Sequence, residues 1–93
     1  MIKSFKDKNA EAIFNGETIR RMALELQKAI MKKLLMLDAA TMLQDLRQPP
    51  SNHFEALHGE REGQYSIRIN SQWRICFTWH DGNVHDVEIV DYH

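Results

Sequence analysis

The sequence has little cysteine and no long hydrophobic run, and each shortage excludes a class of protein. One cysteine among 93 residues cannot form an internal disulfide, which favours a reducing compartment. The N-terminal stretch "MIKSFKDKNAEAIF" is too polar for a signal peptide or a membrane span. We therefore expect a cytoplasmic protein that does not contact membranes.

The sequence also lacks an excess of positive charge. With 12 Lys and Arg against 13 Asp and Glu, the net charge of −1 argues against a simple nucleic-acid clamp. The charges are uneven: residues 1–47 carry nine basic and six acidic side chains, and residues 48–93 carry three basic and seven acidic. The basic half could lie near polyphosphate, but a solvated mixed surface explains the same pattern.

Several catalytic signatures are absent. There is no Walker loop and no GxGxxG, and no two of the five histidines flank a glutamate at metal-binding spacing. The carboxylates form no evident Mg²⁺ cluster, and Cys76 has no thiol partner. We therefore predict no metal and no cofactor.

The helical half of the chain comes first. A length of 93 residues with 43% hydrophobic composition indicates one domain, residues 1–93, which buries roughly 60–65% of its unfolded surface. Apolar spacing predicts a short helix over residues 7–15 that Gly16 ends, and a longer helix from Thr18 through Leu37. Asp38 is a candidate N-cap for a third short helix.

The second half alternates with the period of strands. After the helix-breaking "RQPPSN", the segments "QYSIRIN", "QWRICFTW" and "VHDVEIVDYH" place apolar side chains at odd-numbered positions. This pattern predicts an α+β domain, with N-terminal helices packed on one face of a C-terminal antiparallel sheet of three strands. By the same parity, Trp73 and Trp79 belong to the core, and "MIKSF" is a candidate edge strand.

Apolar residues must pair across each hairpin, which predicts the register. A loop at residues 70–72 pairs Ile67 with Ile75 and Ile69 with Trp73. A loop at residues 81–83 pairs Ile75 with Ile89 and Phe77 with Val87.

The predicted register places Arg68 directly opposite Arg74 on the other face of the sheet, although like charges opposed across strands cost stability. Tyr92 lies diagonally beyond them. Guanidinium groups bind phosphate in a fork, so this face could be an anion site. Alternatively, Asp86 and Glu88 on the same face neutralise the arginines, and the register leaves both interpretations open.

Arg, Tyr, His and Asp side chains gather at the C-terminal end of the sheet. A metal-free site of these residue types can cleave RNA through the substrate's own 2′-hydroxyl. A base removes its proton, arginines stabilise charge on phosphorus, and an acid protonates the departing 5′-oxygen. His93 titrates near neutral pH and therefore suits the acid.

The motifs "L-x-G-x-R-x-G", "SIRIN-x-x-WRI-x-F" and the terminal "DYH" resemble the HigB/GraT branch of the RelE/ParE toxin superfamily, also called plasmid-maintenance killer proteins. The resemblance runs from "MIKSF" to the last residue. It implies a RelE-like fold and the toxin of a type II toxin-antitoxin system. It further implies a ribosome-dependent mRNA endoribonuclease that acts in the A site of the 70S ribosome and inhibits translation and growth. A HigA-type helix-turn-helix antitoxin would neutralise it and would alone contact operator DNA.

The resemblance also implies the site residues. The catalytic set is Arg74, Asp91, Tyr92 and His93, and the substrate-binding set is Arg61, Arg68, His58 and Glu55. Glu55 stands where some HigB proteins have histidine, and His58 where others have lysine. Either residue could supply the general base.

Two other functions remain open. A ParE-like inhibitor of DNA gyrase would have no catalytic residues, and the terminal "DYH" with paired arginines argues against it. An inert, antitoxin-binding relative is favoured by Glu55 and by the acidic second half of the chain.

Overall fold

A computed structural model of the chain describes residues 1–91. Its elements are α1 (Lys8–Phe14), α2 (Leu24–Ala39), β1 (Glu55–Ala56), β2 (Gln64–Arg68), β3 (Trp73–His80) and β4 (Asn83–Asp91). Short 3₁₀ helices occupy Leu43–Arg47, Pro50–Asn52 and Gly59–Arg61. The strands form one antiparallel sheet in the order β1-β2-β3-β4, which confirms the α+β prediction.

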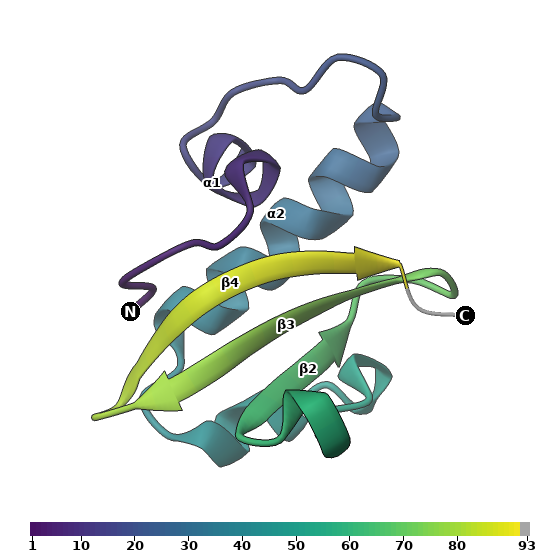
Figure 1. Ribbon diagram of the computed structural model, residues 1–93. Coiled ribbons are helices and arrows are strands. Elements are labelled where there is room, and N and C mark those ends of the chain that lie inside the picture. The colour runs from purple at the N-terminus through teal and green to yellow at the C-terminus, as the bar shows by residue number, and fades with distance from the viewer. Residues whose placement is uncertain (92–93) are drawn as a thin grey trace.

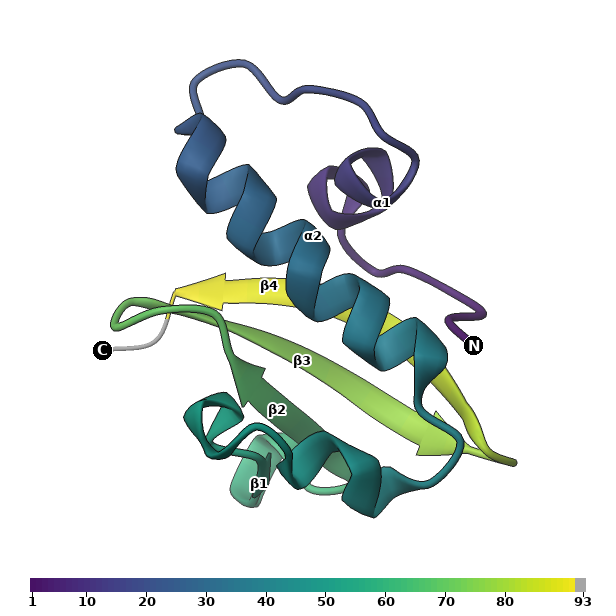
Figure 2. The same ribbon diagram turned by 180° about the vertical axis from the view of Figure 1, so that it is seen from behind.

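Helix α2 runs across one face of the sheet, and neither α-helix covers the opposite face (Figures 1 and 2). Within residues 1–91, no helix is both long and apolar enough to cross a membrane. The opposite face of the sheet, which we call the open face, carries Arg68, which is half-buried, and Arg74, which is 6% exposed.

The core lies between α2 and the odd-numbered face of the sheet. Its fully buried side chains include Ile30, Leu34, Leu37, Ile67, Ile75, Phe77, Val84 and Val87, each with 0% exposure. Burial of one such side chain stabilises the fold by about 1.5–3 kcal/mol. Both tryptophans are half-buried: Trp79 packs against this core as predicted, and Trp73 pairs with Asp91.

The first helix forms as predicted. The Asp7 carboxylate caps α1 by accepting hydrogen bonds from the backbone N–H of Asn9 at 2.8 Å and of Ala10 at 3.4 Å. Its second oxygen accepts from the Ile89 N–H at 3.0 Å, which ties α1 to β4. After α1 the chain turns at Gly16, with a φ of +86° that glycine tolerates.

The predicted start of the second helix at Thr18 is wrong, because α2 begins at Leu24. The Gln27 side chain folds back over the preceding segment, accepting from Ile19 N at 3.0 Å and donating to Ile19 O and Met22 O at 3.0 and 2.8 Å. These bonds satisfy backbone N–H and C=O groups of the segment before α2, so the segment does not need to be helical.

The predicted cap at Asp38 is also wrong. Asp38 lies inside α2, and its carboxylate accepts a hydrogen bond from Ile2 N at 2.9 Å. Asp45 instead caps the following 3₁₀ helix by accepting from the Thr41 and Met42 N–H groups, both at 3.0 Å. The hydrogen bond from the Met42 N–H, followed by the one from the Thr41 N–H, lowers the pKa of Asp45.

The register of the first hairpin is confirmed. Ile67 pairs with Ile75 and Arg68 pairs with Arg74. Ile69 N donates to Trp73 O at 2.9 Å, as the predicted pairing of these residues requires.

The predicted turn of the second hairpin is wrong, although the register beyond it is right. His80 pairs with Asn83, so Asp81 and Gly82 alone form the turn, with φ of +50° and +76° as in a type I′ hairpin. Compared with the predicted three-residue loop, a two-residue turn shifts the pairing of β3 with β4 by one residue. A β-bulge on β4, with Asp86 at φ +54°, shifts the pairing back.

Beyond this bulge Ile75 pairs with Ile89 as predicted. The ladder contains no Phe77–Val87 pair within residues 1–91, because the register shifts between Cys76 and Thr78.

Both edges of the sheet are more elaborate than the predicted three strands. On the β4 side, Ile2 and Phe5 form isolated parallel bridges with Val84 and Val87, which confirms that "MIKSF" lies at an edge. On the β2 side, β1 adds a strand of two residues that sequence alternation cannot reveal. This strand brings residues 53–56 next to the open face.

A buried lysine holds the loop before β1 against α2. Lys33 is 8% exposed, and its Nζ donates to Asn52 Oδ1 at 2.5 Å. Asn52 is fully buried and donates to the carbonyls of Leu46 and Gln48, both at 3.1 Å. Desolvation by burial, and then the charge of Lys32, lower the pKa of Lys33.

The lowered pKa of Lys33 predicts a pH-dependent contribution to stability. Between that pKa and the ordinary value of 10.5, the unfolded chain binds more protons than the folded chain. Stability therefore rises with pH in this window, and the contribution is lost as pH falls through the lowered pKa. Urea unfolding from pH 7 to 11 should show the wild type gaining stability relative to Lys33→Met. A constant difference between the two proteins would contradict this prediction.

Candidate functional site

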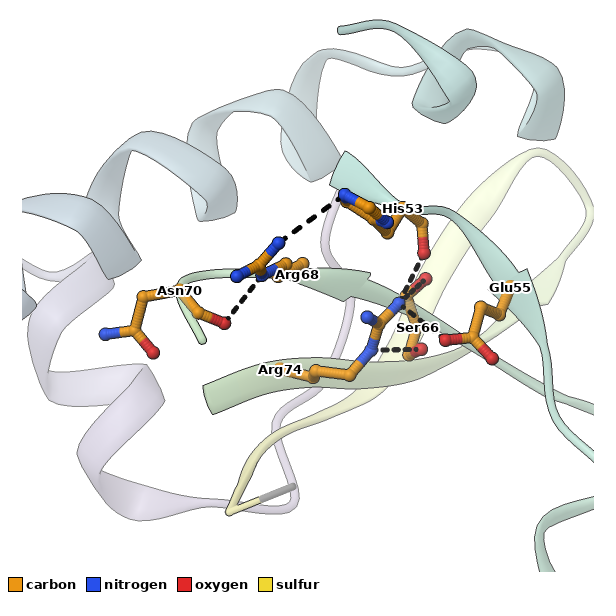
Figure 3. A network of polar contacts seen from close by, with 6 residues as sticks. All are labelled: His53, Glu55, Ser66, Arg68, Asn70 and Arg74. Carbon is orange, nitrogen blue, oxygen red and sulfur yellow. Dashed lines mark hydrogen bonds and ion pairs between the residues drawn. The ribbon is translucent and has the colours of Figure 1, made fainter. Parts of the chain in front are cut away.

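The open face of the sheet carries a polar cluster whose members come from three strands and one loop (Figure 3). Arg68 lies on β2, Arg74 on β3 and Glu55 on β1. His53 follows the 3₁₀ helix at Pro50–Asn52 and adopts a left-handed conformation, with φ +43°. This conformation turns the chain into β1, so His53 reaches the cluster through the loop that Lys33 and Asn52 hold.

Arg74 lies at the centre of the cluster and is only 6% exposed. Its Nε donates to Ser66 Oγ at 2.9 Å, and its Nη2 donates to the carbonyl oxygens of His53 and, at 3.4 Å, of Ser66. Nη2 also lies 3.3 Å from Glu55 Oε1. One guanidinium therefore joins β3 to β2, to β1 and to the loop before β1 (Figure 3).

Arg68 is half-buried and points toward the His53 ring (Figure 3). Its Nε donates to Asn70 O at 2.9 Å, and its Nη1 lies 3.5 Å from His53 Nε2. A guanidinium nitrogen only donates, so a hydrogen bond at this contact would use a lone pair on Nε2. At 3.5 Å the contact is at the limit of hydrogen bonding, and the His53 side chain is exposed.

Acidic residues neutralise part of this face. Their partners differ from the alternative considered above, in which Asp86 and Glu88 neutralise the paired arginines. Glu88 pairs with Arg61 at 2.7 Å, rather than with Arg68 or Arg74. Asp86 receives a hydrogen bond from Ser4 Oγ at 3.5 Å. In the part of the chain that the structure describes, the carboxylate that pairs with Arg74 is Glu55.

The structure brings together some of the predicted site residues and separates others. Arg68, Arg74 and Glu55 form one cluster, whereas Arg61 binds Gln64 Oε1 at 3.0 Å and Glu88 farther along the sheet. His58 is exposed, and among residues 1–91 no polar contact joins its side chain to Arg68 or Arg74.

The predicted C-terminal residues are only partly described. Asp91 ends β4 opposite Trp73, where its carboxylate accepts from Gln72 Nε2 at 3.2 Å. Gln72 belongs to the β2–β3 turn, next to the segment that binds Arg68. Tyr92 and His93 lie outside the described residues, so their predicted roles stay predictions.

His53 is the residue that the sequence analysis missed. The resemblance pointed to Glu55 and His58 as bases, and no local pattern signals a histidine in a loop after two prolines. Its place in the cluster depends on the left-handed backbone and on the hydrogen bond from Arg74 to its carbonyl. The only clue to its role would have been its position, two residues before a strand that lies beside the two arginines.

The cluster combines an exposed imidazole with two guanidiniums, which suits acid–base chemistry beside an anion. Cys76 lies beneath it, 1% exposed, and desolvation by burial raises the pKa of its thiol, so the thiol is poorly suited to nucleophilic attack. Among residues 1–91, no group of three or more His, Cys, Asp or Glu side chains is placed to hold a metal ion.

Comparison with known protein families gives a match over residues 3–93. The matching model describes the RelE-like toxin HigB of type II toxin-antitoxin systems. Among curated relatives, "Toxin HigB-1" of Vibrio cholerae is 42% identical over 83 residues, which is 88% of this chain and 87% of the relative. "Endoribonuclease HigB" of Proteus vulgaris is 34% identical over an alignment of 94 residues that covers 100% of both chains.

Solved structures share the fold at low sequence identity. The YoeB–YefM complex from Staphylococcus aureus contains a chain that aligns with a TM-score of 0.64 at 19% identity, covering 100% of this chain and 98% of that one. YafQ from E. coli aligns with a TM-score of 0.60 at 12% identity, covering 98% and 91%. At these identities the likeness concerns the fold alone.

The contacts of Arg74 predict a large effect on stability. Arg74→Ala leaves the buried Ser66 hydroxyl and the His53 carbonyl without their donor, and should destabilise the fold by about 2–4 kcal/mol. Arg68→Ala is the matched control, because its guanidinium is half-buried and donates to the carbonyl of the exposed Asn70, and should cost about 1 kcal/mol or less. Urea denaturation monitored by tryptophan fluorescence measures both. Equal losses would contradict the central position of Arg74.

Proposed function

The chain belongs to the HigB-like family of RelE-like toxins of type II toxin-antitoxin systems, and from this premise we propose that it is an mRNA endoribonuclease that acts on the ribosome. It acts in the cytoplasm, cuts mRNA in the ribosomal A site, and is neutralised by a HigA-type antitoxin. The observation that carries this proposal is the meeting of His53, Arg68 and Arg74 on the open face of the sheet.

The reaction uses the 2′-hydroxyl of the substrate as its nucleophile. A base takes the hydroxyl proton, the 2′-oxygen bonds to the adjacent phosphorus, and the bond from phosphorus to the 5′-oxygen breaks. An acid gives a proton to that 5′-oxygen, so the products are a 2′,3′-cyclic phosphate and a 5′-hydroxyl. Guanidiniums beside the phosphate stabilise the negative charge that develops on its oxygens.

We assign the general base to His53. Its Nε2 lies 3.5 Å from Arg68 Nη1, so a phosphate held by Arg68 would have its neighbouring 2′-hydroxyl close to the imidazole. Glu55 fits this role less well because its carboxylate is paired with Arg74. Arg68 is the direct phosphate contact, since it is more exposed than Arg74.

Arg74 acts in this scheme chiefly as a positioning residue. It holds the His53 carbonyl and Glu55 in place, and it adds positive charge beneath the phosphate. Asp91 orients the site, and His93, which the resemblance places in the catalytic set, supplies the acid. Tyr92 remains a candidate for stacking on a base or steering the 2′-hydroxyl.

The charge of the protein supports the dependence on the ribosome. Phosphate contacts dominate affinity for RNA, and a chain with a net charge of −1 has few to offer free mRNA. On the ribosome, mRNA is already positioned, so a small number of contacts suffices to align the reacting groups.

We predict clear cleavage of mRNA on translating ribosomes and little cleavage of the same mRNA free in solution. The measurement is primer extension on both substrates at equal protein concentration. Equal rates on the two substrates would contradict ribosome dependence. Growth inhibition without any cleavage would instead favour a non-catalytic poison such as a gyrase inhibitor, and loss of both would favour an inert relative.

The assigned acid and base predict different pH profiles. His53→Asn keeps a residue that tolerates the left-handed conformation but cannot take the proton. Cleavage should fall by about 10²–10⁴-fold, and the limb on which the rate rises with pH should disappear. Deletion of His93 should remove the opposite limb. His80→Asn, at an exposed position beside the β3–β4 turn, is the control and should leave the profile unchanged. An intact rising limb in His53→Asn would refute its assignment as base.

A further inference from the structure

The exposed side of α2 carries large apolar side chains. Leu24 is 62% exposed, Leu35 is 52% exposed, and Met31 between them is partly buried. In Figure 2, α2 lies in front of the sheet, and no other helix or strand crosses it. Burial of these side chains against a partner would be favourable. We refer to the row formed by Leu24, Lys28, Met31 and Leu35 as the α2 stripe.

The α2 stripe has the spacing of a coiled-coil seam. Its residues follow one another at intervals of four, three and four, so they occupy alternating d and a positions of a heptad. At about 100° per residue, this spacing keeps all four on one narrow side of the helix. The opposite side of α2 packs into the core through Ile30, Leu34 and Leu37. The helix therefore has two apolar sides, and residues 1–91 cover only one of them.

An open hollow lies beside the N-terminal half of the α2 stripe. Its volume is about 200 Å³, and its lining includes Ile13, Leu24, Met31 and Glu17. The Gln27 side chain also lines the hollow, and its hydrogen bonds to the backbone of the segment before α2 hold that segment in place. The hollow is therefore already formed in the single chain, and it is large enough for one leucine side chain.

The α2 stripe is complementary to a second, antiparallel copy of itself. Its intervals read the same in both directions, so reversal of one helix places Leu35 opposite Leu24 and Met31 opposite Lys28. Leu35 of the second copy then meets the hollow that Leu24 lines, as a knob meets a hole. Two-fold symmetry repeats the same contact at the other end of the helix pair.

The charges beside the α2 stripe favour the antiparallel orientation. Glu25 and Lys32 are exposed, and each directly follows a d position, so both occupy e positions. In an antiparallel pair the e positions of the two helices face each other, which brings Glu25 of each copy near Lys32 of the other. In a parallel pair Lys28 would instead face Lys28 of the second copy, and like charges repel each other.

We propose that the α2 stripe is an isologous contact between two copies of this chain, in which the two α2 helices run antiparallel. The arginine cluster lies on the opposite face of the sheet, so the open face of each copy stays outside the contact (Figures 1 and 2). The proposal is therefore independent of the proposed function. A seam of four side chains per copy buries a small area, so the dimer is weak and its population depends on concentration.

Sedimentation velocity of the purified chain, from micromolar to millimolar concentration, tests the proposal. We expect a reversible equilibrium between monomer and dimer. Leu35→Lys places a cation in the apolar seam, and a two-fold contact carries each substitution twice, so the Kd of the dimer should rise about 100-fold. Met42→Lys, at an apolar side chain that is 49% exposed and outside the stripe, is the control and should leave the Kd unchanged. A wild type that stays monomeric, or equal effects of the two variants, would overturn the proposal.

An exchange of charges tests the antiparallel orientation. Glu25→Lys and Lys32→Glu each place like charges across the contact twice, and each should raise the Kd about ten-fold. The double variant restores opposite charges and should return the Kd to within about two-fold of the wild type. Glu11→Lys makes the same change in the first turn of α1, outside the stripe, and should have no effect. A double variant that dimerises no better than the single variants would refute the antiparallel pairing.

Cross-linking identifies the partner of the α2 stripe directly. A zero-length carbodiimide cross-linker should join Glu25 of one copy to Lys32 of the other, in a product with twice the mass of the chain, and Leu35→Lys should abolish this product. The stripe could instead be covered by a HigA-type antitoxin. Cross-links from Glu25 or Lys32 to a co-purified antitoxin, without the product of double mass from the chain alone, would assign the surface to the antitoxin and overturn the proposal.

Discussion

The buried guanidinium of Arg74 is the interaction on which the open face of the protein depends. A charge in a largely dry position is tolerated only where hydrogen-bond acceptors surround it, and Ser66, the His53 carbonyl and Glu55 provide them. These acceptors belong to β2, to the loop before β1 and to β1. Because one side chain connects all three, the position of His53 beside Arg68 follows from where Arg74 lies.

The same loop is held from its other side by a second buried cation. Lys33 bonds to Asn52, the residue directly before His53, and Asn52 in turn bonds to the carbonyls of Leu46 and Gln48. The segment that carries the proposed base is therefore fixed between α2 and the sheet. This arrangement suits a site that must align a hydroxyl with a phosphate before any proton moves.

Much of the sheet could be predicted from the sequence, because the alternation of apolar residues determines which face is buried. That alternation was sufficient to place Arg68 opposite Arg74 and Ile75 opposite Ile89. The errors arose where a side chain or a strained residue replaced regular structure: Gln27 delays the start of α2, and the bulge at Asp86 compensates for a shorter turn. Strand register and motif resemblance both pointed to the arginines, but the place of His53 depends on contacts distant in sequence, which no local pattern encodes.

The central claim is that this cluster cuts RNA with the substrate's own 2′-hydroxyl, and the chemistry of the product ends tests it most directly. The measurement is mass spectrometry of the fragments released from ribosome-bound mRNA. The account predicts a 2′,3′-cyclic phosphate, or the 3′-phosphate formed from it, on the upstream fragment and a 5′-hydroxyl on the downstream fragment. It also predicts no cut where the nucleotide before the scissile bond carries 2′-deoxyribose. A 3′-hydroxyl with a 5′-phosphate would contradict the account, because those ends require water to attack the phosphorus.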